Sequence, residues 1–218
     1  MMAVLEGGTG MAKLRHRRFV IRGFVVSIFL AAGLSLPALP ATAAGPSDTV
    51  RQFYGALLET MQQAKQLGPR GRFQKLEPAV QHAFDLPFMA RLSIGSAWTG
   101  LNPEQKRRAS QAYGRYATAI YASRFDGYAG EKFEIIGEQK VRRGTIVNSR
   151  IVKSDGEPVA INYLVHDNMV GYQIRDVYLS GTISELATRR SEFASILQSG
   201  GIDGLIAALN KKADDLQG

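Results

Sequence analysis

The chain has 218 residues, with 27 Lys and Arg against 19 Asp and Glu, a formal net charge of +8 and no cysteine. The missing cysteines exclude disulfides, thiol catalysis and cysteine-based metal sites. Five of the basic residues and one of the acidic residues lie in positions 1–43, so the remainder carries 22 basic and 18 acidic residues, a net charge of +4. This modest balance weakens a nucleic-acid-binding hypothesis based on total charge.

The first 43 residues have the three-part layout of a signal peptide. Five basic residues precede an apolar run from Phe24 to Leu36, and Ala41-Thr42-Ala43 has the small-residue pattern of a cleavage site. The run of about 13 residues is too short to span roughly 30 Å of hydrocarbon. We expect residues 1–43 to be a cleaved signal peptide and residues 44–218 to form one domain, with an uncleaved anchor as the alternative. The general secretory route is favoured over the twin-arginine route hinted at by Arg17-Arg18.

The first part of the predicted domain is helical. Apolar residues recur at helical spacing over 47–68 and 72–83, and Asp85 can cap a third helix. The clearest start is Asn102-Pro103-Glu104-Gln105, where Asn102 caps, Pro103 occupies the first turn and Gln105 completes a capping-box-like pair. This fourth helix should run to about Phe125.

After Gly127 the apolar period changes from near four to two. Strands are predicted at 133–141, 145–153, 158–165 and 169–179, and the turns between them include Asp155-Gly156 and His166-Asp167-Asn168. Such short connections predict a four-stranded antiparallel meander with one face covered and the other solvated. Two closing helices follow, one from Ser184 to Gly200-Gly201 and one over 202–209. The predicted fold class is α+β, with about six helices packed on one face of a strongly curved sheet.

The sequence has few groups of residues that are typical of catalytic sites. The sequence has no nucleophile elbow, phosphate-binding loop or zinc-protease motif. His166 and Asp167 are adjacent on a strand end, where their side chains point to opposite faces. We therefore predict no catalytic residue, no metal and no cofactor. The remaining feature is an excess of large apolar and aromatic residues, which either fill a core or line an apolar cavity; periodicity leaves both open.

Three segments carry a resemblance to a known family. They are Phe84-Asp85-Leu86-Pro87-Phe88-Met89-Ala90-Arg91, Leu101-Asn102-Pro103-Glu104-Gln105 with the 113–125 helix, and Phe193-Ala194-Ser195-Ile196-Leu197-Gln198-Ser199-Gly200-Gly201-Ile202-Asp203-Gly204-Leu205. In order and spacing they resemble the MlaC-type periplasmic lipid-binding proteins, the toluene-tolerance auxiliary components of ABC transporters. Gly95-Ser96-Ala97-Trp98 is similar to the hopanoid-biosynthesis-associated, HpnM-like branch. One departure is Arg175–Ser184, which lacks a tyrosine and a glutamate common in the family and puts partner docking there in doubt.

The resemblance implies a curved sheet backed by helices around an acyl-chain pocket. It implies a monomeric periplasmic carrier of phospholipid or hopanoid that maintains outer-membrane lipid asymmetry. The implied partners are an inner-membrane ABC transport complex and an outer-membrane lipoprotein–porin complex, and no nucleic acid. Strand and helix parity select the expected lipid-binding residues: Phe88, Leu92, Trp98, Tyr116, Ile120, Val147, Ile151, Ile161, Tyr163, Ile174, Phe193 and Leu197.

A basic set is expected either to dock on anionic head groups or an acidic partner, or to be an ordinary solvated helix face. Its members are Lys106, Arg107, Arg108 and Arg115. Two other functions stay open. One is a small-molecule enzyme in a curved-sheet cone, with Asp176 as the best acid or base if the last strand has the opposite parity. The other is a ligand-free assembly subunit of hopanoid or lipid export machinery.

Overall fold

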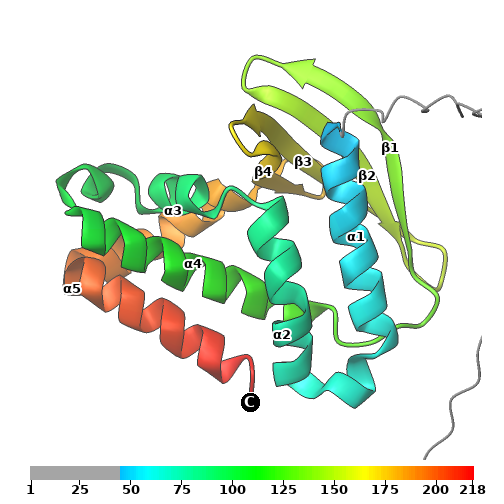
Figure 1. Cartoon of the computed structure of the whole chain (residues 1–218), viewed down its shortest axis with the longest axis horizontal. Coiled ribbons are helices and arrows are strands. Elements are labelled where there is room, and N and C mark those ends of the chain that lie inside the picture. Colours follow the sequence, from blue (N-terminus) through cyan, green and yellow to red (C-terminus); the bar gives the residue numbers. More distant parts are fainter. Residues whose placement is uncertain (1–44) are drawn as a thin grey trace, which may run out of the picture. The chain divides into compact units, whose positions relative to one another are not determined.

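The computed structural model describes residues 45–218, and the signal peptide predicted for residues 1–43 lies outside the described residues. The elements in chain order are α1 (Pro46–Gln62), α2 (Ala64–Ala83), α3 (Leu86–Ile94), the 3-10 helix η1 (Gly95–Gly100), α4 (Pro103–Arg124), β1 (Lys132–Val141), β2 (Gly144–Val152), β3 (Pro158–Asn168), β4 (Gly171–Leu179), β5 (Ile183–Ser184) and α5 (Glu185–Asp215). The α+β class is therefore confirmed (Figure 1).

Two predicted helix starts are confirmed by their caps. The Asp85 carboxylate accepts a hydrogen bond from the Phe88 backbone N–H at the start of α3. At α4, Asn102 and Gln105 bond to each other's backbone N–H groups at 2.8 and 3.0 Å, a complete capping box. These contacts satisfy N–H groups that a helix start leaves unpaired.

Within residues 45–218 the sheet has five strands, in the order β1-β2-β3-β4-β5, all antiparallel and not closed into a barrel. The prediction of four strands was one short, because β5 has only two residues and pairs with the end of β4. The expectation of about six helices was also inexact. The described part has five α-helices and η1, since the two closing helices join into α5 across a break at Gly201, whose φ is 61°.

The turn between β3 and β4 lies later than predicted. Asn168 pairs with Gly171, so Met169-Val170 forms the turn and His166-Asp167 belong to β3. The Asn168 side chain accepts a hydrogen bond from Val170 N–H at 3.0 Å, and Gly171 adopts a φ of 110°. An Asn side chain that bonds to the backbone two residues later is itself a turn-forming device, which explains the position.

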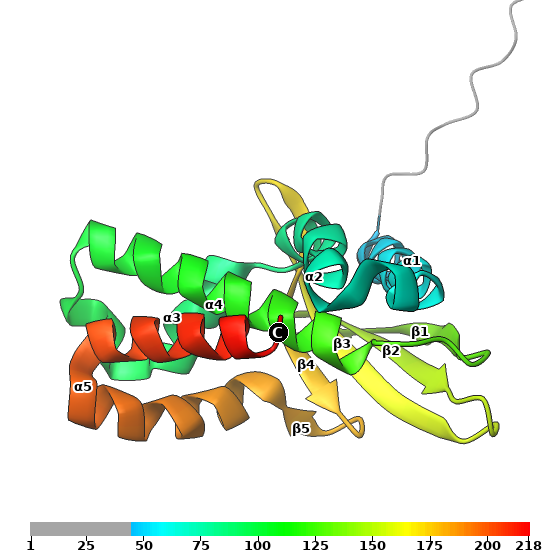
Figure 2. The ribbon, with the colours of Figure 1, turned by 90° about the horizontal axis from the view of Figure 1, so that it is seen from below.

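Helices α1 and α2 lie over one face of the sheet, whereas α3, α4 and α5 extend beyond the β4–β5 edge (Figure 2). Under α1, the Tyr54 hydroxyl contacts Ser149 Oγ at 2.6 Å, and Val147 and Tyr163 are fully buried. The other face of the sheet was predicted to be solvated, but part of it is covered. Leu164 is only 7% exposed there, because α3 and the start of α5 cover this corner.

A β-bulge between Leu164 and Val165 sets which β4 side chains face α1. Ile174 pairs with Val165 and Val177 pairs with Tyr163, so these odd and even positions share one face. Asp176 pairs with Leu164 and lies on the opposite face. One extra residue thus reverses the simple period-two alternation along β4.

In the described range, no helix combines the length and the apolar composition needed to cross a bilayer.

Replacing Gly144 at the start of β2 by a larger residue is predicted to destabilise the fold. Its φ is 142°, and an added Cβ would lie 2.2 Å from the Val165 carbonyl oxygen. Gly144→Ala should lower the free energy of unfolding by about 2 kcal/mol or more, because both the strained backbone and the clash oppose it. The measurement is the urea midpoint at unchanged m-value. Gly137→Ala in β1, where a Cβ meets nothing within 4 Å, is the matched control; equal losses in the two variants would contradict the explanation.

Candidate functional site

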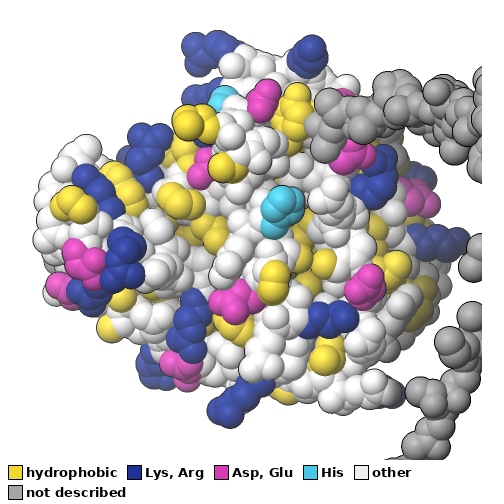
Figure 3. Space-filling view, viewed as in Figure 1, with side chains coloured by type: hydrophobic (Ala, Val, Ile, Leu, Met, Phe, Trp, Pro, Cys, Tyr) yellow, Lys and Arg dark blue, Asp and Glu magenta, His cyan; other side chains and the backbone are white. Residues whose placement is uncertain are grey.

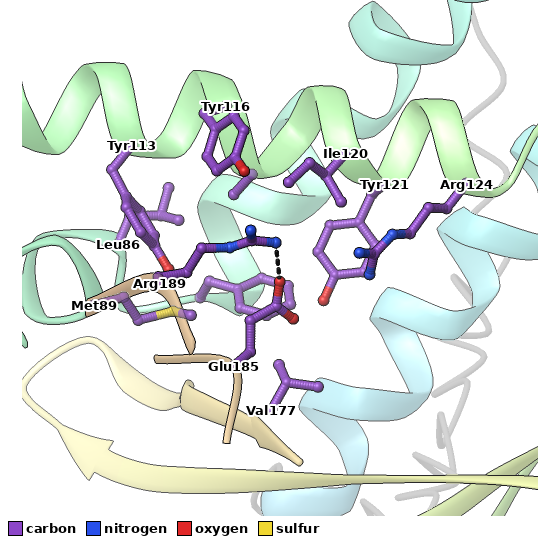
Figure 4. Close-up of a pocket in the computed structure, with 12 residues that line it drawn as sticks. Leu86, Met89, Tyr113, Tyr116, Ile120, Tyr121, Arg124, Val177, Glu185 and Arg189 are labelled. Carbon is purple, nitrogen blue, oxygen red and sulfur yellow. Dashed lines mark hydrogen bonds and ion pairs between the residues drawn. The ribbon is translucent and has the colours of Figure 1, made fainter. Parts of the chain in front are cut away.

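A partly open cavity lies where α4, α3 and the start of α5 meet the edge of β4 (Figure 4). Its walls are formed by Phe84, Leu86, Met89, Tyr113, Tyr116, Ala117, Ile120, Tyr121, Arg124, Val177, Glu185 and Arg189. Helix α4 packs on α2, α3 and α5, and the cavity occupies the gap between it and the sheet edge.

Aromatic side chains dominate the walls. Tyr113 and Tyr116 lie one turn apart on α4, and Phe193 of α5 packs behind both with ring centroids 6.4 Å away. Burial raises the pKa of Tyr113 and of Tyr121 further above neutral pH, because the charged phenolate is poorly solvated there. The cavity therefore presents mostly rings and aliphatic groups to whatever enters it.

One end of the cavity is polar. The Arg189 guanidinium, 8% exposed, donates to Glu185 at 2.8 Å and to Glu192 at 2.7 Å. It also lies 5.2 Å from the centre of the Tyr116 ring, within cation–π range. Burial alone would lower the pKa of Arg189, but the hydrogen bonds to Glu192 and Glu185 outweigh it and raise that pKa.

The cavity is small. Its volume is ≈ 30 Å³, room for a few water molecules at most. Pockets that hold drug-sized ligands measure about 300–1,000 Å³. The structure thus has an apolar, aromatic-walled cavity at this place, and in this form the cavity is too small for a fatty chain.

The twelve residues expected to bind lipid occupy different surroundings. Tyr116 and Ile120 line the cavity, and Phe193 supports its wall. Val147, Ile151, Tyr163 and Ile174 are buried, and Val147, Tyr163 and Ile174 belong to the main core. Trp98, Ile161 and Leu197 are half-buried against the same core. Phe88 and Leu92 line a separate hollow over the other face of the sheet.

Sequence reasoning missed most of the wall. Tyr113, Ala117 and Tyr121 flank Tyr116 and Ile120 on the inward face of α4, so a wider helical face would have found them. Glu185 and Arg189 carried no such signal. Opposite charges four residues apart on a helix ordinarily indicate a solvated face. Among residues 45–218, no group of three or more His, Asp or Glu side chains is placed to hold a metal ion.

The basic set on α4 is largely paired within the molecule. Arg107 bonds to Glu104 and Gln111, Arg108 to Asp203, and Arg115 to Asp214. Basic and acidic side chains are interspersed over the face seen in Figure 3. These pairs are exposed, so they contribute little stability and can exchange partners.

Asp176 does not face the cavity. Its carboxylate accepts hydrogen bonds from Ser184 Oγ at 2.6 Å, Val177 N–H at 2.8 Å and Leu186 N–H at 3.2 Å. These contacts tie β4 to the first turn of α5. Burial raises the pKa of Asp176 despite the hydrogen bonds.

The raised pKa predicts a pH dependence of stability. A carboxyl with a higher pKa in the folded state binds its proton more tightly when folded. Its contribution to stability is therefore fully present below the unfolded value of 3.8, and is lost as pH rises through the folded value. Between pH 7 and pH 4, the free energy of unfolding of the wild type should rise relative to that of Asp176→Asn. Urea titrations of both proteins at several pH values measure this difference, and a difference that falls toward pH 4 would contradict the assignment.

Fold and site together define the class of protein. It is an α+β domain with an open antiparallel sheet and an apolar cavity between the edge of that sheet and α4, which packs on three other helices. The chain matches the model of the MlaC protein family over residues 51–211, and it belongs to that family. Among solved structures it is similar to a phospholipid-binding protein from Ralstonia solanacearum that was determined in complex with a phospholipid. The two share 21% sequence identity and a TM-score of 0.70, over 80% of this chain and 100% of that one. At this identity the likeness establishes a shared fold.

Proposed function

We propose that the protein is a periplasmic lipid carrier that takes acyl chains into the cavity between α4 and β4. The observation that carries this proposal is an aromatic-walled cavity, without a catalytic arrangement in its wall, in a member of the MlaC family. The Ralstonia solanacearum protein of the same fold holds a phospholipid, which favours phospholipid as the ligand class. A hopanoid, suggested by the resemblance of Gly95–Trp98, is the competing ligand.

Transfer energetics favour a carrier of this kind. Burying a CH₂ group is worth ~0.8 kcal/mol, so a sixteen-carbon tail gains roughly 12 kcal/mol on leaving water. Escape of a two-chain lipid through water is correspondingly slow. A tail in a protein cavity and a tail in a bilayer are both dry, so exchange between them is close to neutral. Net direction between the outer membrane and an inner-membrane ABC complex then comes from the ATP-driven partner.

Loading requires the cavity to widen. Half-buried apolar side chains continue its lining, with Ile120 on α4 and the paired Ile161 and Leu179 on the sheet face that carries Val177. Because α4 rests on other helices, it can move from the sheet edge without breaking a strand pair. Tyr116, Ile120 and Phe193 would then contact the tail first, and the other expected lipid-binding residues would join as the space grows.

The carrier function is tested on protein exported to and purified from a bacterial periplasm without detergent. Native mass spectrometry should detect a bound lipid, and extraction should identify it as phospholipid or hopanoid. Vesicles of dioleoylphosphatidylglycerol provide a second source of ligand. Protein that carries no lipid and takes none from vesicles would defeat the proposal and favour a ligand-free assembly subunit.

Filling the cavity should block loading. Ala117→Phe adds a ring to the cavity wall, and we expect at least about a tenfold fall in lipid bound per protein, with a stability cost of about 1–3 kcal/mol from overpacking. Ala207→Phe, at an exposed position of α5, is the matched control. The readout is lipid-to-protein ratio after incubation with vesicles; equal loading of both variants would place the acyl site elsewhere.

The basic set of α4 is proposed to steer docking. Reversing two charges, Lys106→Glu with Arg107→Glu, should slow lipid delivery to vesicles rich in phosphatidylglycerol, and the effect should shrink in high salt. The melting temperature should change little. Lys132→Glu with Lys140→Glu reverses two exposed charges on β1 and serves as control. Indistinguishable delivery rates would assign the set to an ordinary solvated face.

A further inference from the structure

Arg189 is buried although both of its ion-pair partners lie on its own helix, which is an unusual position for an arginine. It is 8% exposed, yet Glu185 and Glu192 lie on the same helix, four residues before and three residues after it. Pairs within one helix tie no elements together, and the same pairs could form on the solvated side at a smaller desolvation cost. Helical pairing therefore does not explain why the guanidinium faces the cavity (Figure 4).

The polar end of the cavity retains hydrogen-bonding capacity. A guanidinium has five N–H donors, and the two hydrogen bonds of Arg189 to its glutamates leave several of them for another acceptor. The Tyr121 hydroxyl points into the same space and bonds to no other side chain or backbone group among the described residues. Arg124, one turn further along α4, lines the cavity as well.

The charges in the cavity wall are unbalanced in favour of an anion. Arg124, Glu185 and Arg189 are the charged residues that line it, and together they carry a net charge of +1. Glu192 lies at the rim, with 48% of its side chain exposed. A single negative charge with several acceptor oxygens, next to an apolar chain, would match both the charge and the free donors.

We propose that Arg189, assisted by Arg124 and Tyr121, binds the phosphodiester of the lipid, and that Glu185 is the partner Arg189 exchanges for it on loading. This inference rests on the proposed carrier function and specifies its ligand. Without lipid, Glu185 and Glu192 both pair with the guanidinium. With lipid bound, the phosphate takes the place of Glu185, and Glu192 stays at the rim. The site then selects phosphate-bearing lipids over diacylglycerols and over hopanoids that lack phosphate.

The test compares two lipids that share their tails and differ in phosphate. The full domain is incubated with vesicles of dioleoylphosphatidylglycerol, or with neutral vesicles that contain dioleoylglycerol, and bound lipid is quantified. Arg189→Met should reduce retention of phosphatidylglycerol by about tenfold or more, since a charge-assisted hydrogen bond is lost. Retention of dioleoylglycerol should not change. Arg190→Met, which removes the adjacent exposed arginine, should leave both unchanged.

A second variant distinguishes phosphate binding from a purely structural effect. Glu185→Gln keeps the side-chain shape but weakens the ion pair that competes with the phosphate for Arg189. Phosphatidylglycerol retention should therefore equal or exceed that of the wild type. Equal losses of both lipids in Arg189→Met, no loss of either, or a fall in phosphatidylglycerol with Glu185→Gln would each overturn the proposal. If the wild type binds dioleoylglycerol but not the phospholipid, the phosphate site fails while the apolar cavity stands. If it binds neither, the carrier function fails.

Discussion

Three aromatic rings from three elements hold α4 in position over the sheet edge. Phe53 of α1 meets Phe84, between α2 and α3, at 4.9 Å and Tyr121 of α4 at 5.0 Å, both edge-to-face, and Phe84 lies 5.6 Å from Tyr121. Such contacts are worth about 0.5–1.5 kcal/mol each beyond the area they bury. Phe84 and Tyr121 also form one wall of the cavity. The same cluster therefore packs α4 against α1 in this structure and bounds the cavity that we propose takes acyl chains.

Because of this arrangement, the interior beside α4 is intermediate between a fully packed core and an open ligand pocket. In this structure, the side chains that would line an expanded pocket pack against one another. A tail that enters replaces contacts between rings and aliphatic groups with contacts of the same kind, so the exchange costs little dispersion energy. The polar end follows the same logic in our proposal, in which a lipid phosphate replaces Glu185 as a partner of Arg189.

The elements that depend on local chemistry were predictable from the sequence. The Asn102–Gln105 capping box, the Asp85 cap and the turn at Asp155-Gly156 are set by neighbouring residues, and the structure has all three. The residues that depend on distant contacts were not. The bulge at Arg175, opposite Leu164 and Val165, changes which β4 positions face α1, and β5 forms only because β4 is beside it. Arg189 shows the limit most clearly, since its charge pattern indicates a solvated face while the fold turns it inward.

The most direct test of the central claim is a crystal structure of the protein with dioleoylphosphatidylglycerol. We expect an acyl chain between Ile120 and Val177 in a cavity several times larger than the present one, with α4 displaced from the sheet edge. We also expect strand pairing unchanged from β1 to β5. A lipid bound elsewhere on the chain, with this cavity still closed and its aromatic walls in place, would contradict the claim.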